Sequence, residues 1–544
     1  MRRRLSAPTA ALAVIAVAAS ALAACSDEPE TSPDGVITLF APQWPDQPLD
    51  DNAFTKHIEA KFDVDLQFET TTYDAGPAAE KRQISLASGD YPDAYMLVPW
   101  VTQFSRDEIE TLGSQGVIVP LQDLVAEHAP NITAAFEKVP EYEQRAYNSE
   151  GVLWGLPQWN DCFHCQYSSK LWMNQAWLDT LGLVQPTTPE ELRTVLEAFK
   201  TQDPNGNGQA DEIPLSGAVG NPILPYLMSP FAYSGGFDTT GATPASLALD
   251  GDQVVLQPTT DGWREGLTYI RELWEDGLVD DGAFTQNGEA FGVKTDNPDA
   301  VIVGATTGQQ PASNMDLEDG RNFQYQAVPP LTGPDGDNVS WAGGGPLSAS
   351  FVITNRASEA KQQKLIEIMD YIYTYEGHLL GEFGEEGVNW ARPEAGDVPL
   401  DETMPPLFKT LTAPEGQGVN TAWGAMTQYF SDAEFRGGQI VPTDVNTREG
   451  YERRLFEATL PYSEADTSKA FPYWEVSVTG DQAQELSTVQ TNLETFLSQA
   501  NAEFITGIRD IRDDAAWQSF QDEINGFGAE QYTAIYQTAW DEVK

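Results

Sequence analysis

VITLF at residues 36–40, VDLQF at 64–68 and DAYMLV at 93–98 are three short runs with the apolar or alternating pattern of strands. Residues 52–62 and 78–88, which lie between these runs, carry apolar side chains at helical spacing. A β-α-β-α-β order of this kind is typical of a doubly wound sheet with helices on both faces. The sequence therefore predicts an α/β lobe at the start of the folded chain.

Two tryptophans follow the ends of the predicted strands. Trp44 comes just after the first run, and Trp100 comes just after the third. Ligands of doubly wound sheets bind beyond the carboxyl ends of the strands. We therefore expect both side chains to line a binding site.

The chain has 14 Trp, 19 Tyr and 24 Phe, and many of the tryptophans stand beside Gly, Pro, Asn or Asp. Flat apolar faces next to polar side chains suit sugar rings, whose C–H faces stack while their hydroxyls form hydrogen bonds. Tryptophans on loops are better candidates for this role than those in helical patterns. Besides Trp44 and Trp100, the candidate ligand-binding residues are Trp154, Trp159, Trp341, Trp390 and Trp423.

The rest of the chain is mixed α/β, with a helical last quarter. At 544 residues, a single core is improbable and two or more lobes are expected. Sharp breaks are predicted at residues 334–336 (PDG) and 343–345 (GGG). Further helices are predicted over residues 189–200, 262–276, 357–375 and 486–504.

The net charge of the chain excludes some classes of binding partner. Thirty Lys and Arg residues stand against 83 Asp and Glu residues, which gives a formal net charge of −53. Such a surface repels phosphate backbones, so nucleic acid is excluded as the main partner. Anionic lipid headgroups are disfavoured for the same reason.

The first residues predict export. Met1 is followed by three arginines, and residues 10–24 form an apolar run that is too short to span a bilayer but fits a secretory signal. The run ends in Leu-Ala-Ala-Cys at residues 22–25, which resembles the lipobox of bacterial lipoproteins. This resemblance implies a signal peptide over residues 1–24 and a diacylglycerol anchor on Cys25. The alternative is an ordinary signal peptide in which Cys25 is incidental.

Residues 25–35 are expected to be a lipid-anchored flexible tether, because they are small, polar and contain proline. Loss of the three arginines lowers the net charge of the mature chain to −56. No later stretch is long and apolar enough for a membrane span. The mature protein is therefore expected on the extracellular face of the cytoplasmic membrane.

Cys162 and Cys165 are the two remaining cysteines, in the segment Asp-Cys-Phe-His-Cys at residues 161–165. In an oxidising compartment this pair is most simply a structural disulfide. A redox-active thiol pair is the sharper alternative. A zinc site would need further ligands, and His164 is the one nearby member of the chain's four histidines.

Residues 203–212 (DPNGNGQADE) carry the most specific chemistry in the sequence. Oxygen-bearing side chains at positions 1, 3 and 5, with glycine at 6, match the first half of an EF-hand loop. Position 12 is Pro214 in place of the usual glutamate, so the carboxylates at positions 9 and 10 are expected to replace it. A structural Ca²⁺ fits this oxygen-rich set, and a polar Asn-Gly turn without metal is the alternative. The candidate metal residues are Asp203, Asn205, Asn207, Gln209, Asp211 and Glu212.

Catalytic motifs give no support for an enzyme. The chain has no Gly-x-Ser-x-Gly elbow, no His-Glu-x-x-His and no phosphate-binding glycine loop with lysine. A glycosidase carboxylate pair comes from distant positions, so spacing alone does not test for one. We therefore predict a protein that is not an enzyme and keep a secreted glycan-cleaving enzyme as an alternative.

Several segments taken together resemble the extracellular solute-binding lipoproteins of ABC importers. The likeness is to the oligosaccharide-binding family 1 type, in the branch of the alginate-oligosaccharide-binding proteins, and it runs from about Val36 to the end of the chain. The segments that carry it are residues 171–174 (LWMN), 177–183 (WLDTLGL), 186–191 (PTTPEE), 212–215 (EIPL), 263–267 (WREGL), 273–280 (LWEDGLVD), 371–377, 384–388 (GEEGV), 486–489 (LSTV) and 504–507 (FITG).

The resemblance implies a two-lobed periplasmic-binding-protein-like fold of type II, in which each lobe is a sheet flanked by helices and the ligand cleft lies between them. We expect residues 36–155 and 330–400 to form the N-terminal lobe. Residues 156–329 and 401–544 are expected to form the C-terminal lobe, which contains the calcium loop. Contacts transferred around Asn160 and Asp161 also become candidates for ligand binding, next to the unusual cysteine pair.

The function implied is capture of an oligosaccharide by lobe closure and delivery to the transmembrane subunits of an ABC permease, by a monomer. A strongly acidic protein disfavours polyuronates unless basic residues such as Lys294 or Arg321 line the cleft, so neutral sugars are preferred. The alternatives are a binder of a non-sugar ligand such as a peptide and the glycan-cleaving enzyme named above.

Overall fold

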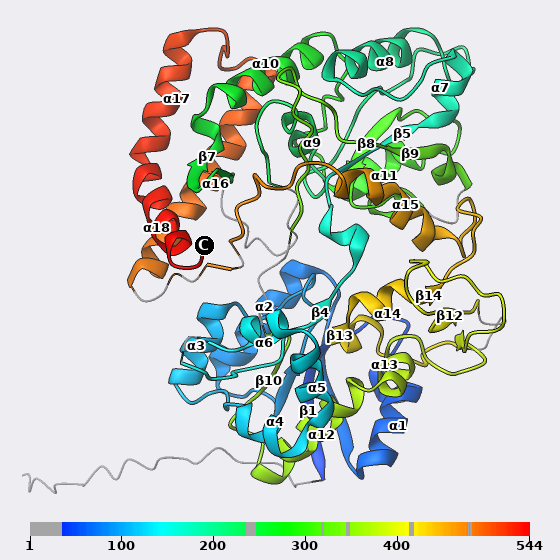
Figure 1. Ribbon diagram of the computed structural model, residues 1–544, viewed down its shortest axis with the longest axis vertical. Coiled ribbons are helices and arrows are strands. Elements are labelled where there is room, and N and C mark those ends of the chain that lie inside the picture. Colours follow the sequence, from blue (N-terminus) through cyan, green and yellow to red (C-terminus); the bar gives the residue numbers. More distant parts are fainter. Residues whose placement is uncertain are drawn as a thin grey trace, which may run out of the picture.

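Two lobes make up the computed structural model, and few segments join them (Figure 1). The structure describes residues 35–148, 150–235, 246–316, 320–343, 349–412, 418–473, 475–476, 478 and 481–544. The predicted signal peptide, Cys25 and nearly all of the predicted tether lie outside the described residues. No helix among the described residues is long and apolar enough to cross a membrane.

The first lobe is built on a four-stranded sheet in the order β10-β3-β1-β2. Its strands are β1 (Val36–Pro42), β2 (Asp65–Thr71), β3 (Ala94–Met96) and β10 (Phe351–Ile353). β1 pairs in parallel with both β2 and β3, and β10 is antiparallel to β3 at the edge. The predicted β-α-β-α-β unit is therefore confirmed, and a strand from much later in the chain completes the sheet.

Helices surround this sheet, as expected for an α/β lobe. α1 begins at Asn52, whose side chain accepts hydrogen bonds from the backbone N–H groups of Phe54 and Thr55. α2 ends at Gly89, which has a left-handed φ of 73°. The helices of this lobe are α1 (Ala53–Phe62), α2 (Ala75–Ser88), α3 (Arg106–Ser114), α4 (Gln122–His128), α5 (Pro130–Lys138), α6 (Pro140–Ala146), α12 (Glu359–Ile372) and α13 (Tyr375–Glu382).

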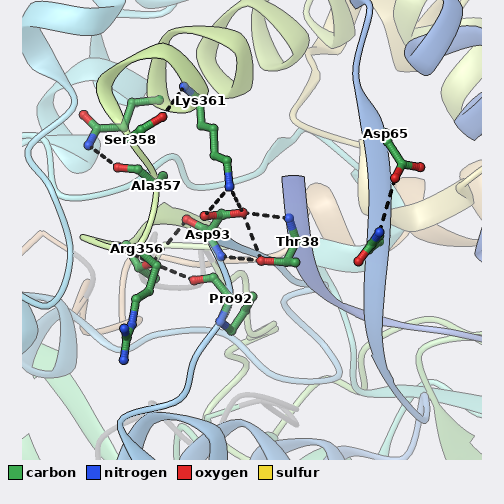
Figure 2. A network of polar contacts seen from close by, with 11 residues as sticks. Thr38, Asp65, Pro92, Asp93, Arg356, Ala357, Ser358 and Lys361 are labelled. Atoms are coloured by element: carbon green, nitrogen blue, oxygen red, sulfur yellow. Dashed lines mark hydrogen bonds and ion pairs between the residues drawn. The ribbon is translucent and has the colours of Figure 1, made fainter. Parts of the chain in front are cut away.

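A buried ion pair ties α12 to the sheet (Figure 2). Lys361 Nζ lies 3.1 Å from Asp93 Oδ2, and the two side chains are 0% and 3% exposed. The same carboxylate oxygen accepts hydrogen bonds from the backbone N–H of Thr38 at 2.8 Å and from its hydroxyl at 3.0 Å. One carboxylate thus joins β1, the residue before β3, and α12.

The helix predicted over residues 357–375 is confirmed as α12, and a separate helix, α13, begins at Tyr375, where the prediction ends. The break occurs at Thr374, which is extended and caps α13 by accepting a hydrogen bond from the backbone N–H of Gly377. A Cβ on Gly377 would lie 1.9 Å from the carbonyl oxygen of Tyr371, so only glycine permits this tight junction.

The second lobe has a three-stranded antiparallel sheet with β5 (Lys170–Asn174) between β8 (Ala305–Gly308) and β9 (Tyr325–Val328). A separate hairpin, β6 (Leu247–Asp250) and β7 (Gln253–Leu256), packs on the C-terminal helix. The helices of this lobe are α7 (Gln175–Leu181), α8 (Pro189–Thr201), α9 (Leu224–Met228), α10 (Asp261–Glu275), α11 (Gly288–Thr295), α15 (Tyr451–Ser463), α16 (Asp481–Thr506), α17 (Asp514–Gly526) and α18 (Ala529–Asp541).

Smaller elements lie on the side of the first lobe that carries α13. They are β11 (Trp390–Ala391), β12 (Phe408–Thr410) and β14 (Gln439–Ile440), which form one sheet, β4 (Trp159–Asn160) and β13 (Phe430–Ser431), which pair in parallel, and α14 (Ala433–Gly437).

Two large apolar cores show which segments belong together. One joins residues of 37–159 with residues of 351–429, and the other joins residues of 167–331 with residues of 462–536. Leu331, predicted in the N-terminal lobe, packs in the second core, whereas Trp423, predicted in the C-terminal lobe, packs in the first. The predicted lobe boundaries at 329/330 and 400/401 therefore come too early in the chain.

Contacts with α1 explain the place of Trp423. The side-chain amide of Asn52 donates to the carbonyl of Ala422 at 2.8 Å, and Trp423 Nε1 donates to Thr55 Oγ1 at 2.8 Å. The ring of Trp423 meets that of Phe54 edge-on at 4.9 Å. These contacts hold the segment that precedes β13 on the first lobe.

Three stretches cross between the cores. The chain passes from Trp159 to Tyr167, returns between Leu331 and Phe351, and crosses again after Tyr429. β4 and β13 pair side by side where the first and third stretches leave the first lobe. This pairing makes the junction between the lobes a shared structural element.

Candidate functional site

A row of three aromatic rings, with a half-buried ring between two exposed ones, lies at the carboxyl ends of β1, β2 and β3. The rings of Trp44 and Tyr73 stack with their centroids 4.2 Å apart and their planes at 4°. The ring of Tyr73 lies 5.5 Å from that of Trp100, at 34°. Trp44 and Trp100 are each 46% exposed, which is unusual for so large an apolar side chain.

The parallel sheet explains why these rings meet. Parallel strands end at the same edge, and the backbone N–H of Gln43 continues the β1–β2 pairing by donating to the carbonyl of Thr71 at 2.8 Å. Trp100 stands in the tight turn after β3, where the N–H of Val101 donates to the carbonyl of Val98. The structure therefore brings together the two tryptophans that strand position predicts.

Tyr73 is a site residue that the sequence reasoning missed. It stands just beyond the end of β2, so the positional argument that selected Trp44 and Trp100 applies to it as well. Burial raises the pKa of its hydroxyl to about 12, so the phenol stays neutral and can donate a hydrogen bond at neutral pH.

Trp159, Asn160 and Asp161 stand together where the chain leaves the first lobe. Trp159 is 9% exposed, and its Nε1 donates to Asp161 Oδ2 at 2.9 Å. Asp161 also accepts from the backbone N–H of Ala433, and burial raises the pKa of its carboxyl. Asn160 is exposed, with its amide 3.4 Å from Gln428 Oε1. This cluster therefore presents an accessible amide beside a tryptophan held in a fixed orientation.

A buried polar network supports the same crossing. Gln428 donates to Glu382 Oε1 at 2.7 Å, and the other oxygen of Glu382 lies 2.7 Å from His378 Nε2. That ring nitrogen is also 3.3 Å from Ser431 Oγ on β13. Burial alone would raise the pKa of Glu382, but hydrogen bonds and charge from His378, Arg436 and Gln428 hold it below its ordinary value.

The other predicted tryptophans do not join the aromatic row. Trp154 is half-buried and donates to Glu110 Oε2 at 3.2 Å, and Trp341 is half-buried in the second lobe beside Tyr167 and Tyr462. Trp390 and Trp423 are 2% and 3% exposed, because each packs in a core. These last two have no free face for a sugar ring and are not part of the site that we propose.

The predicted metal loop is compact and rich in oxygen. The side-chain amides of Asn205 and Asn207 both donate to the carboxylate of Asp211 at 3.0 to 3.2 Å. Asp203 Oδ2 accepts from the backbone N–H of Gly208, so the loop closes on itself. Gly208 has a φ of 74°, the left-handed conformation that the sharp turn of such a loop requires.

The surroundings of the Glu212 carboxylate show whether a cation fits this loop. Its Oε1 is buried and accepts no hydrogen bond among the described residues. Burial raises the pKa of its carboxyl, and the nearby carboxylates of Asp211 and Asp203 raise it further. Three acidic groups that repel each other around a buried oxygen are what a hard divalent cation would stabilise. The residues therefore fit Ca²⁺, with Asp203, Asp211 and Glu212 as the charged ligands.

The cysteine pair forms the predicted disulfide. Cys162 and Cys165 are bonded, with their Cα atoms 5.2 Å apart; Cys162 precedes the short 3₁₀ turn η2 (Phe163–Gln166) in the first crossing stretch, and Cys165 lies within it. His164 is buried inside this turn, and burial together with the charges of Lys170 and Arg436 holds its pKa well below the usual value. Lys170 is fully buried and donates to the carbonyls of His164 and Tyr167.

A groove of about 790 Å³ lies on the second lobe, between α8 and α10. Phe231, Tyr269 and Ile511 contribute its apolar surface. The two arginines that line it already have partners: Arg264 donates to Asp514 and to the carbonyl of Ile511, and Arg512 donates to Glu275. The groove is therefore a second candidate binding site, and binding experiments need to distinguish it from the aromatic row.

No family model matches the chain. The chain is 25% identical over 574 residues to the fructooligosaccharide ABC transporter substrate-binding protein FusA of Streptococcus pneumoniae, and the alignment covers 98% of this chain and 96% of FusA.

Over nearly the full length of both chains, the likeness is thus to a solute-binding protein of an ABC transporter. A second relative, the polygalacturonan/rhamnogalacturonan-binding protein YtcQ of Bacillus subtilis, is 22% identical over 380 residues, covering 68% of this chain and 70% of YtcQ. Both relatives are named as binding proteins, not as enzymes.

Solved structures share the fold. The structure of FusA in complex with kestose has a TM-score of 0.71 at 22% identity, and the match covers 93% of this chain and 99% of FusA. An extracellular solute-binding protein from Bifidobacterium longum subsp. infantis has a TM-score of 0.74 at 20% identity, with 95% and 100% covered. Another FusA structure is of an EF-hand mutant in complex with fructo-nystose.

Proposed function

We propose that this protein captures a neutral oligosaccharide between its two lobes and delivers it to the transmembrane subunits of an ABC importer. The observation that carries the proposal is the aromatic row of Trp44, Tyr73 and Trp100, whose two tryptophans are exposed, at the carboxyl ends of the first lobe's parallel strands. Such rings present flat apolar faces, and sugars are the class of polar ligand that uses them. The named substrate of FusA, a fructooligosaccharide, supports this class.

The other polar groups of the site come from the junction between the lobes. Asn160 offers an exposed amide, and Trp159 and Asp161 hold each other in place beside it. Trp154 on the first lobe and Trp341 on the second are the remaining candidates. Hydroxyl groups of a sugar stacked on the aromatic row would find hydrogen-bond partners among these residues.

Lobe closure would supply the signal for transport. A ligand that contacts both lobes favours the closed state only by its additional contacts in that state. Because three stretches cross between the cores and β4 pairs with β13, the lobes can rotate about one shared element without separating. A closed, loaded protein would then be the form that docks on the permease.

Calcium is the proposed structural cation. Asp203, Asp211 and Glu212 would supply charge, while Asn205, Asn207 and the backbone carbonyl of Gln209 would complete an oxygen shell. The FusA structure described as an EF-hand mutant supports such a loop among the relatives of this protein. Its role here is to fix the loop that follows α8.

A lipid anchor on Cys25 would hold the protein at the outer face of the cytoplasmic membrane. The lipobox-like residues 22–25 carry this proposal. In a bacterial host, Cys25→Ala should release the protein from the membrane fraction into the medium. Retention of the variant in the membrane fraction would refute the anchor.

The experiment is calorimetric titration of the soluble chain from Ser26 onward, in Ca²⁺, with kestose and nystose, a galacturonate oligosaccharide and a tripeptide. We expect saturable binding of a neutral sugar that is recovered chemically intact. Trp44→Ala should weaken binding, whereas the control Phe231→Ala, in the groove on the second lobe, should not. Binding of the peptide alone, or cleavage of the sugar, would overturn the proposal.

A further inference from the structure

The disulfide turn at the junction of the lobes holds a third group that no role in sugar binding explains. His164 lies buried between the two cysteines, with its Nε2 3.6 Å from the sulfur of Cys162 and 3.6 Å from that of Cys165. The ligand atoms of these three side chains all lie within 4.8 Å of one another. The turn thus gathers two sulfurs and an imidazole around one point.

These distances match a soft-metal site. In a tetrahedral zinc site the Zn–S and Zn–N bonds are about 2.3 Å and 2.0 Å, which places a sulfur and a nitrogen ligand roughly 3.5 Å apart. The Cys-x-x-Cys spacing of Cys162 and Cys165 is also the usual spacing of paired zinc cysteines. The bond between the two sulfurs is what prevents metal binding in the oxidised chain.

A carboxylate on a neighbouring helix points independently to a metal-bound histidine. Glu452, on α15, places its Oε2 3.7 Å from His164 Nδ1, the ring nitrogen that does not face Cys165 and that also lies 3.7 Å from the sulfur of Cys162. This oxygen is buried and accepts no hydrogen bond among the described residues, although Arg436 lies 3.7 Å away. Histidines that bind metals commonly donate their second ring N–H to a carboxylate, which fixes the tautomer.

We propose that reduction of the Cys162–Cys165 disulfide converts this turn into a zinc site. Cys162, Cys165 and His164 would be the ligands, Glu452 would orient the histidine, and the fourth position would be left for water. The metal would restrain the crossing turn after its covalent bond is lost, so that the junction between the lobes is held in both redox states.

The chemistry requires an external dithiol as reductant. Its thiolate attacks the sulfur of Cys165, the more accessible of the two, and Cys162 leaves as a thiolate. The second thiol of the reductant then displaces Cys165 and becomes part of a disulfide, so two electrons and two protons pass to the protein. Binding of Zn²⁺ releases the two thiol protons and gives a neutral Zn(thiolate)₂ unit with one imidazole.

Cobalt(II) is the probe, because thiolate ligands give it a charge-transfer band that oxygen ligands do not. The soluble chain is reduced with a trialkylphosphine, which becomes a phosphine oxide with oxygen from water, and is titrated with Co²⁺ in excess Ca²⁺ to occupy the loop at 203–212. We expect the band to saturate at one equivalent in reduced protein, to be absent in oxidised protein, and to be bleached by Zn²⁺.

Variants separate a built site from simple dithiol chelation. Cys162→Ser with Cys165→Ser should abolish the band, and Glu452→Gln should weaken Co²⁺ binding by about 10-fold to 100-fold. His128→Gln, at a half-buried histidine of α4, is the matched control and should change nothing. Absence of the band when two free thiols are titrated would overturn the proposal, and so would unchanged affinity in both Glu452→Gln and His164→Gln.

Discussion

Replacement of Trp100 by alanine tests the aromatic row most directly. A tryptophan side chain covers up to about 250 Å² of surface when buried, and Trp100 is 46% exposed, so roughly 115 Å² is open to a ligand. A sugar ring that stacks on one face would cover about half of this, or about 60 Å². At ~25 cal/mol per Å² the lost contact is worth about 1.5 kcal/mol, which is roughly a tenfold rise in Kd.

The structure also indicates that the fold should tolerate the change. Trp100 stands in a turn whose backbone hydrogen bond, from Val101 to Val98, does not use the side chain. Tyr73 would lose one neighbouring ring but keep its closer stacking on Trp44, at 4.2 Å. We therefore expect a melting temperature within a few degrees of the parent chain.

The assay is isothermal titration of parent, Trp100→Ala and Trp100→Phe with the best neutral sugar found. Phenylalanine keeps a smaller ring, so its Kd should fall between those of the other two proteins. The control is Phe527→Ala, which removes an exposed aromatic on the C-terminal helices and should leave Kd unchanged. A Trp100→Ala protein that is folded and binds with parental affinity would refute the assignment of this row.

Three further predictions concern stability. Asp93→Ala should lower the free energy of unfolding by about 3–5 kcal/mol in urea titrations, because it removes the carboxylate from a buried ion pair, and a loss below 1 kcal/mol would contradict this. Chelation of Ca²⁺ should lower the melting temperature of the parent but not of Asp211→Ala, and equal shifts in both would argue against calcium in the loop. Glu382 has a lowered pKa in the folded protein, so its ionised carboxylate stabilises the fold fully at pH values above its ordinary pKa of 4.5. This stabilisation is lost as the pH falls further. Glu382→Gln should therefore flatten the decline in stability below about pH 5, and identical pH profiles would remove this role.

Local patterns were enough to predict three of the four strands of the first lobe's sheet and two of the three rings of the aromatic row. Alternating and apolar runs identified β1, β2 and β3, and the rule that ligands bind beyond strand ends selected Trp44 and Trp100. The same rule would have found Tyr73, because it too follows a strand end. The structure adds the stacking of these rings, which depends on the parallel pairing of β1 with β2 and so on contacts between separate segments.

The buried tryptophans show what could not be predicted from the local sequence pattern. Trp390 and Trp423 stand among Gly, Asn and Ala, as a loop-borne ligand contact would. Their burial comes from distant segments: Thr55, on α1, accepts the indole N–H of Trp423, and β12 covers Trp390 from a sheet whose strands are two or three residues long. Strands this short carry no periodicity from which they could be predicted. The same kind of contact places residues 418–431 on the first lobe. They were predicted in the other lobe, because contacts between distant segments leave no local pattern.

Two cations on the helix that follows Tyr73 affect which class of sugar the aromatic row can bind. Arg82 is 4% exposed, and its Nη2 lies within hydrogen-bond distance of both carboxylate oxygens of Glu108, while Lys81 Nζ donates to the carbonyl of Thr70. Both cations stand on α2, the helix that follows Tyr73, and each already has a hydrogen-bond partner in the protein, although Arg82 Nη1 is buried without one among the described residues. A uronate would need such a group to break its present contacts, against a net charge of −53 on the chain. A neutral sugar needs no cation, so its affinity should barely change between low and high salt, whereas a strong salt dependence would indicate a charged ligand.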